Sequence, residues 1–233
     1  MSAAQAMILA AGRGERMRPL TDGCPKPLLQ VKGKPLIEYH LDAFARAGFR
    51  DVVINTAWLG EQIEDHCGHL SAAGTRIAYS HEGKDFGGAL ETAGGIARAL
   101  PLLDEVFWLV AGDVYMPEFR FSREALERFA AGSRLAHLFL VPNPAHNPKG
   151  DFGLSPDGLA LAAADLRYTY STTALFRRSF FAALPAGNPQ GVKAALGPML
   201  REAMQHGAVS AELYTGAWTD VGTPQRLAQL NAG

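Results

Sequence analysis

Glycines and arginines alternate in the segment AGRGERMR near the start of the chain, directly after a short apolar run at residues 6–11. Gly12 and Gly14 have no side chains, so the backbone N–H groups there can approach an anion closely. Cationic side chains belong to the same segment, namely Arg13, Arg16 and Arg18. Exposed amides beside several guanidinium groups predict a loop that binds a polyphosphate.

Lys26 follows this loop in the sequence PKP, between Pro25 and Pro27. A proline ring fixes one backbone angle of its own residue and favours an extended backbone for the residue before it. We therefore expect the Lys26 side chain to be positioned beside the phosphates before any ligand binds.

The spacing of the loop excludes two commoner phosphate motifs. A dinucleotide-binding fingerprint, G-x-G-x-x-G, would need a third glycine where Met17 stands. A P-loop, G-x-x-x-x-G-K-[ST], does not occur in the sequence. The remaining alternative is that the glycines only turn the chain and that the arginines are solvated at the surface.

Two aspartates far apart in the sequence form a second candidate group. Asp113 ends the apolar run VFWLVAGD, and Asp220 lies in WTDVGT. The carboxyl ends of strands form the edge at which open α/β sheets bind ligands. A pair of carboxylates completed by nucleotide phosphates is a usual way to hold Mg²⁺. Taken alone, each aspartate is equally typical of a turn or a helix cap.

Apolar runs and helical patterns alternate along the chain, which predicts an α/β fold. We expect a doubly wound, mostly parallel, Rossmann-like sheet with helices on both faces, in a single domain of residues 1–233. Strands are predicted at residues 6–11, 51–56, 76–80, 106–111, 135–141, 168–176 and 209–214. Helices are predicted at residues 35–48, 59–67, 91–100, 122–131 and 193–206, and from residue 223. Residues 81–89 and 142–150 are predicted as flexible segments; His146, in the second, is expected to be an exposed loop histidine.

Composition narrows the class of protein further. The chain has 233 residues, of which 48% are hydrophobic, and its formal net charge is -1, so neither nucleic acid nor an anionic membrane is an expected partner. The sequence lacks a signal-type segment and an apolar run of about 18 residues, so we expect a cytoplasmic protein. Cys24 and Cys67 are expected to be reduced thiols.

The pattern G-x-G-x-R-x-R-P-x-T followed by P-K-P, together with the G-D and D-x-G-T elements, resembles the signature of the sugar-1-phosphate nucleotidyltransferases. The resemblance extends from Met7 to about Leu230. It implies Mg²⁺ on Asp113 and Asp220, and a reaction between an NTP and a sugar-1-phosphate. It further implies catalytic roles for Arg16 and Lys26, nucleotide binding by Ala10, Ala11, Gly12, Arg13, Gly14, Glu91, Thr92 and Ala93, and sugar binding by Asp151, Gly153 and Ser171.

Within that family, the elements NPAHNPKGDFGL, LET, LREAM and WTDVGT look like those of the bacterial N-acetylmuramate α-1-phosphate uridylyltransferases of cell-wall recycling. The resemblance implies UTP and N-acetylmuramate-1-phosphate as substrates, and a monomer or homodimer. Many guanylyl and thymidylyl relatives have glycine where Glu91 stands, so Glu91 is a candidate discriminator of the nucleotide. The alternative interpretation of Glu91 is a carboxylate in the first turn of a helix, where the helix dipole favours it.

Other functions remain as alternatives. They are a mannose-1-phosphate guanylyltransferase, a glucose-1-phosphate thymidylyl- or uridylyltransferase, and a catalytically silent module that binds nucleotides. A metal-dependent glycosyltransferase ranks last, because Asp113-Val114-Tyr115 lacks the second aspartate of a D-x-D motif.

The chain also departs from the patterns that it resembles. Ala93 replaces a glycine of the muramate-type L-E-T-G-G-G element. A Glu-Lys-Pro segment of many relatives is missing, and Arg167 is a candidate to replace its lysine. The pair Ser171-Thr172 stands where relatives have Asn-Ala-Gly or Ser-Gly. These departures concern the base and the sugar rather than the phosphates.

Overall fold

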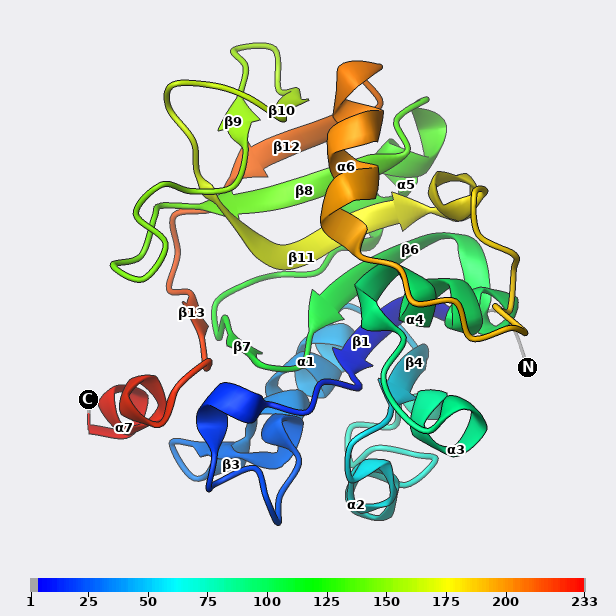
Figure 1. Cartoon of the computed structure of the whole chain (residues 1–233), viewed down its shortest axis with the longest axis vertical. Coiled ribbons are helices and arrows are strands. Elements are labelled where there is room, and N and C mark those ends of the chain that lie inside the picture. Colours follow the sequence, from blue (N-terminus) through cyan, green and yellow to red (C-terminus); the bar gives the residue numbers. More distant parts are fainter. Residues whose placement is uncertain (1–3, 233) are drawn as a thin grey trace.

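A computed structural model describes residues 4–232 of the chain, so residues 1–3 and 233 of the predicted domain lie outside it. A seven-stranded sheet forms its centre (Figure 1). From one edge to the other, its strands are β12 (Val209–Leu213), β8 (Ala136–Val141), β11 (Thr169–Arg177), β6 (Leu103–Ala111), β1 (Ala4–Ala10), β4 (Asp51–Thr56) and β5 (Arg76–His81).

Strand direction confirms the mostly parallel prediction. The strands β6, β1, β4 and β5 run parallel to one another, as do β12 and β8. The strand β11 runs antiparallel to both of its neighbours. Because it is reversed, the first residues of β11 lie beside the carboxyl ends of β8 and β6. Loops before and after its start therefore reach the edge at which such sheets bind ligands.

Helices cover both faces of the sheet, as predicted. One buried cluster takes side chains from α4 (Glu91–Ala99) and α6 (Leu196–Gln205). The cluster on the opposite face takes side chains from α1 (Leu36–Arg46), α2 (Gly60–Cys67) and α5 (Arg123–Ala131). The helix α7 (Pro224–Ala232) lies beside the N-terminal part of the chain (Figure 1). No helix within residues 4–232 is both long and apolar enough to cross a lipid bilayer.

Short elements complete the fold. Single-turn 3-10 helices occur at Glu15–Met17, Lys26–Leu28, Leu100–Leu102 and Arg178–Phe181. Two-residue strands form three antiparallel pairs: β2 (Gln30–Val31) with β3 (Lys34–Pro35), β7 (Val114–Tyr115) with β13 (Thr219–Asp220), and β9 (Gly153–Leu154) with β10 (Ala160–Leu161). Cys24 and Cys67 are free thiols, as expected.

The interpretation of residues 81–89 as a flexible segment was wrong, because the segment contains the helix α3 (Glu82–Phe86). Its first residue, Glu82, is fully buried. The carboxylate accepts hydrogen bonds from Asn55 Nδ2 at 2.6 Å and from the Leu90 N–H at 2.7 Å. Burial raises the pKa of Glu82, and these two donors oppose the rise. Glycine-rich composition indicated a loop, whereas a buried carboxylate fixes the segment between β4 and α4.

The last predicted helix but one begins three residues later than expected, at Leu196 instead of residue 193. The preceding segment is held in an extended form against α4. Its residue Ala194 accepts hydrogen bonds from the Ala93 and Gly94 N–H groups and donates one to the Leu90 carbonyl. These bonds bring the start of α6 next to the start of α4.

Candidate active site

A cavity of about 690 Å³ lies at the carboxyl ends of β1 and β6, and extends beneath α6 to the start of β11. Many of the residues predicted from the sequence meet there. Those that line the cavity are Ala10, Ala11, Gly12, Lys26, Glu91, Thr92, Asp113 and Asp151. Residues predicted for the phosphates, the base and the sugar therefore line one cavity.

Lys26 and Asp113 form an ion pair in this cavity. Lys26 begins a 3-10 helix that Pro25 enters in an extended conformation, as the two prolines predict. Its side chain is 11% exposed, so the ammonium is directed inward and not into solvent. Asp113 follows Gly112 at the end of β6, where a Cβ on the glycine would lie 3.0 Å from the Leu9 carbonyl oxygen. The close packing of β6 on β1 thus places the carboxylate beside the lysine.

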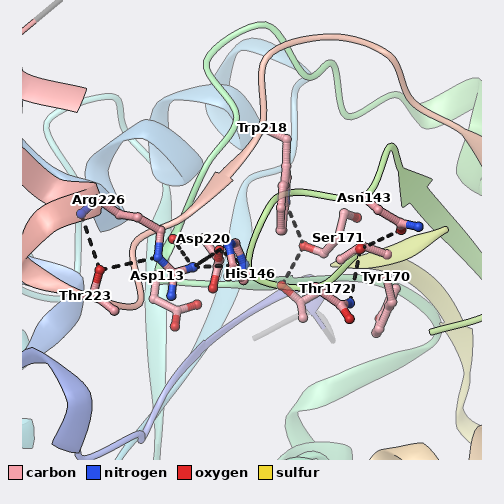
Figure 2. Close-up of polar contacts among 12 residues, drawn as sticks. Asp113, Asn143, His146, Tyr170, Ser171, Thr172, Trp218, Asp220, Thr223 and Arg226 are labelled. Carbon is pink, nitrogen blue, oxygen red and sulfur yellow. Dashed lines mark hydrogen bonds and ion pairs between the residues drawn. The ribbon is translucent and has the colours of Figure 1, made fainter. Parts of the chain in front are cut away.

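Asp220 does not line the cavity but lies beside Asp113. The two-residue strands β7 and β13 pair antiparallel, with Asp220 opposite Val114, and the Val221 N–H donates to the Asp113 carbonyl at 2.8 Å. Figure 2 shows both aspartates at this junction. Two carboxylates that reach one place from different segments suit a Mg²⁺ ion that takes few protein ligands. No group of three or more metal-ligating side chains occurs in residues 4–232, so phosphate and water oxygens would have to complete such a site.

Asp220 is held by two side chains that the sequence did not assign to the site. Arg226, on α7, forms an ion pair with it and donates to its carbonyl at 3.1 Å. His146 Nε2 lies 2.9 Å from Asp220 Oδ1 (Figure 2). The histidine is an exposed loop residue, as predicted, and its contact with Asp220 is an addition that the sequence did not indicate. A usable signal was the T-x-x-R spacing, since Thr223 Oγ1 accepts from the Arg226 N–H at 3.3 Å and folds the arginine back over the turn.

The arginines of the first loop do not line the cavity. The Arg13 guanidinium lies 3.6 Å from the centre of the Trp58 ring and donates to the Thr21 carbonyl at 2.9 Å. It also pairs with Asp22, which lowers the pKa of that carboxyl group. Arg13 therefore stabilises the loop. Arg16 is exposed and has no hydrogen bond or ion pair among the residues that the structure describes, so it is free to contact a ligand outside the cavity.

The other loop glycine, Gly14, is needed for its backbone conformation. Its φ is +70°, and a Cβ there would lie 3.1 Å from Thr21 Cγ2. The Thr21 hydroxyl donates to the Gly14 carbonyl at 2.9 Å, which closes the loop on itself. Gly14 thus shapes the loop from outside the cavity lining.

Ser171 is buried and does not reach the sugar end of the cavity. Its hydroxyl donates to the Phe139 carbonyl at 2.6 Å, and its carbonyl accepts from Trp218 Nε1 at 3.1 Å (Figure 2). The cavity is lined instead by Thr172, which has a φ of +60°. Successive side chains of β11 point to opposite faces, so Tyr170 and Thr172 face the cavity whereas Ser171 faces away from it. The expectation for Ser171 failed for that reason.

Glu91 and Thr172 share a backbone feature. Glu91 has a φ of +59°, and both residues are thus in the left-handed region that glycine adopts at least cost. The cavity wall therefore contains two non-glycine residues in a backbone conformation that suits glycine best.

The remaining predicted residues lie close to the cavity wall. Asp151 accepts from the Tyr170 N–H at 2.8 Å and from Asn147 Nδ2 at 3.2 Å, so its carboxylate is fixed. A Cβ atom on Gly153 would lie only 2.4 Å from Ala164 Cβ, so the glycine is needed for packing there. Gly153 does not line the cavity. Ala93 is buried against the segment before α6.

Sequence reasoning missed the contribution of α6. Arg167, the candidate to replace the missing lysine, does not line the cavity, whereas Arg201 on α6 does. Its guanidinium carbon lies 5.4 Å from the centre of the Phe152 ring. The sequence element LREAM contains this arginine, but the pattern alone does not show which face of the helix meets the cavity.

Known proteins share this arrangement. The model of the nucleotidyl transferase family matches residues 5–155, which include the glycine loop, Lys26 and Asp113. The chain belongs to that family.

Individual relatives extend the match to the whole chain. The N-acetylmuramate α-1-phosphate uridylyltransferase of Neisseria meningitidis serogroup B is 48% identical over 98% of this chain and 97% of its own length. The enzyme of the same name from Caulobacter vibrioides is 31% identical over 94% of this chain and 92% of its own length. A Bacillus anthracis protein provisionally named a glucose-1-phosphate thymidylyltransferase, crystallised with a sucrose, has the same fold, with a TM-score of 0.81 and 18% identity over 98% of this chain and 94% of that chain.

Proposed function

We propose that this protein transfers UMP from UTP to N-acetylmuramate-1-phosphate, with release of pyrophosphate. The observation that carries the proposal is the full-length similarity to the Neisseria meningitidis enzyme, which spans both the phosphate end and the sugar end of the cavity. The similarity to a Drosophila mannose-1-phosphate guanylyltransferase covers only 47% of this chain, so a guanylyl reaction is less well supported. Such a uridylyltransferase would act in the recycling of cell-wall sugars, in the cytoplasm where UTP is made.

The chemistry we assign is an in-line displacement at the α-phosphorus. An oxygen of the sugar phosphate forms the new bond to that phosphorus, and the bond to the bridging oxygen of pyrophosphate breaks. The attacking phosphate is already ionised at neutral pH, so no general base is needed. Catalysis then depends on alignment of the two substrates and on neutralisation of charge at the phosphate oxygens.

Lys26 is the residue best placed to neutralise the α-phosphate. Its ammonium is buried in the cavity and already paired with a carboxylate, so it needs little reorganisation when the substrate binds. The N–H groups around Gly12 would hold the β- and γ-phosphates, with Arg16 approaching from the surface. Thr92 and the start of α4 would contact the base.

Asp113 and Asp220 would hold Mg²⁺, and a bound Mg²⁺ would supply positive charge shared between the α-phosphate and the incoming sugar phosphate. The donor set supports this assignment, because two carboxylates from adjacent strands leave the other coordination positions to phosphate oxygens. Arg226 and His146 keep the Asp220 carboxylate oriented.

The experiment that tests the function is pyrophosphate release from each of the common NTPs with Mg²⁺. Each NTP is combined with N-acetylmuramate-1-phosphate, N-acetylglucosamine-1-phosphate, glucose-1-phosphate and mannose-1-phosphate. Release confined to UTP and N-acetylmuramate-1-phosphate is expected. If pyrophosphate is released with another pair of substrates, the proposed reaction type stands but the proposed substrates are wrong. If no pair releases pyrophosphate, a catalytically silent module that binds nucleotides is favoured.

A further inference from the structure

Arg201 is an uncompensated cation in the cavity. Cationic residues among those lining the cavity are Lys26 and Arg201, and Lys26 is paired with Asp113. The Arg201 side chain has no ion pair or hydrogen bond with any residue from 4 to 232, and its guanidinium faces the ring of Phe152. A guanidinium that stacks on an aromatic ring while its N–H groups stay free is suited to bind an anion.

This cation lies in a different part of the cavity from the phosphate machinery. Asp113 follows the carboxyl end of β6 and is paired with Lys26 of the 3-10 helix Lys26–Leu28, whereas α6 crosses over β8 and β11 (Figure 1). Phe152 pairs with Tyr168 immediately before β11. The anion that Arg201 binds is therefore a second one, separate from the phosphates held by Lys26.

The surroundings of Arg201 favour a carboxylate of the sugar. Leu196 and Gly197, in the first turn of the ten-residue helix α6, line the same cavity, and no side chain caps that turn. Helix N-termini carry partial positive charge and free N–H groups. Tyr170 also lines the cavity, and its buried hydroxyl has no hydrogen-bond partner among the described residues. A ligand with both an anionic and a polar group would satisfy these donors.

We propose that Arg201 binds the lactyl carboxylate of N-acetylmuramate and thereby selects this sugar-1-phosphate over those that lack the group. The inference rests on the proposed function and adds the residue that determines the sugar. N-acetylmuramate differs from N-acetylglucosamine by its lactyl ether, whose carboxylate is the only charge that distinguishes them. Arginine binds a carboxylate through two parallel N–H donors, which gives direction as well as affinity.

The test compares wild-type protein with Arg201→Met and Arg201→Lys in steady-state assays of pyrophosphate release. With N-acetylmuramate-1-phosphate, Arg201→Met is expected to raise the KM about 10- to 100-fold, the range for loss of hydrogen bonds to a charged group. With N-acetylglucosamine-1-phosphate, and for UTP, the KM is expected to change less than about twofold. Arg201→Lys should recover part of the preference, because it restores the charge without the paired donors.

Arg46→Met is the matched control, since Arg46 is an exposed helical arginine on α1, away from the cavity. Equal rises in KM for both sugars, or a rise in the KM for UTP, would overturn the assignment of Arg201 while leaving the reaction intact. Wild-type protein that does not use N-acetylmuramate-1-phosphate at all would overturn both the proposed function and this subsite. Thermal unfolding of each variant establishes that the fold is retained.

Discussion

Beside β6, the charged side chains of the site are paired: Lys26 with Asp113, and Arg226 with Asp220. On α6, the Arg201 side chain has no carboxylate partner among residues 4–232, and Thr172, which lines the same cavity, has a backbone conformation that disfavours a β-branched residue. The difference indicates that the two regions serve different purposes. The paired region is arranged in advance for a reaction that does not depend on the sugar, whereas the other region is completed only by its ligand.

Disruption of the Lys26–Asp113 pair is expected to have the largest effect. Asp113→Ala or Lys26→Ala should lower kcat/KM at least about a thousandfold, because each removes charge that acts on the phosphates in the transition state. Pyrophosphate release measures the loss. Asp104→Ala, at the opposite end of the same strand β6, is the control and should change the rate less than about twofold. Near-normal turnover in either site variant would remove the paired region from the mechanism.

The folded protein should also lose stability in acid, because of His40, which is buried next to the paired region. This histidine of α1 is buried and lies 3.0 Å from the Val114 carbonyl oxygen, next to Asp113, and burial lowers its pKa to about 4. The ordinary value in the unfolded chain is higher, so the unfolded state binds the proton first. Stability is therefore complete above about pH 6.5 and falls by up to about 3 kcal/mol as the pH drops towards 4.

Urea unfolding at pH 7.5, 6.0 and 5.0 measures this loss. In His40→Gln the amide can still donate to the Val114 carbonyl, and most of the pH dependence should disappear. His206→Gln, at an exposed position directly after α6, should keep the wild-type curve. An unchanged pH dependence in His40→Gln would show that other groups control the acid sensitivity.

Arg226→Met is expected to have an intermediate effect. Without the guanidinium, His146 alone would orient the Asp220 carboxylate, and loss of such a supporting partner typically costs about 10- to 100-fold in metal affinity or activity. Pyrophosphate release measured over a range of Mg²⁺ concentrations should show a lower kcat, a higher Mg²⁺ requirement, or both. Arg226→Lys, which keeps the charge, should lie between wild type and Arg226→Met. Wild-type behaviour of Arg226→Met would reduce the paired region to Lys26 and Asp113.

Thr172→Gly should have the smallest effect, and it should be stabilising. A non-glycine residue at positive φ costs of order 1–3 kcal/mol, part of which the greater entropy of unfolded glycine offsets. We expect a net gain of about 1 kcal/mol, seen as a rise in Tm of about 2–4 °C. Thr173→Gly, in the adjacent buried strand position, should lower Tm instead. A lower Tm in Thr172→Gly would mean that the threonine is stabilised by contacts that outweigh its backbone conformation.

Sequence reasoning succeeded where the relation between residues is local or follows from parallel strands. The PKP segment predicted a fixed lysine, and the carboxyl ends of β1 and β6 had to lie together, so Lys26 and Asp113 could be associated without a structure. Arg226 and Arg201 could not be placed, because their roles depend on how α7 and α6 approach the sheet. Ser171 was assigned to the sugar because the sequence does not show which face of β11 meets the cavity; strand alternation turns Tyr170 and Thr172 toward it and Ser171 away.

The position of Asp220 on β13 has a consequence for the order of synthesis. The strand that presents Asp220 pairs with β7, which leaves the ribosome much earlier, and the side chain that orients Asp220 belongs to α7, the last helix described. A nascent chain that has completed the sheet through β12 still lacks one of the two carboxylates. The pairing of Lys26 with Asp113 can therefore form before β13 is synthesised, whereas the second carboxylate comes with β13 and the arginine that orients it comes only with α7.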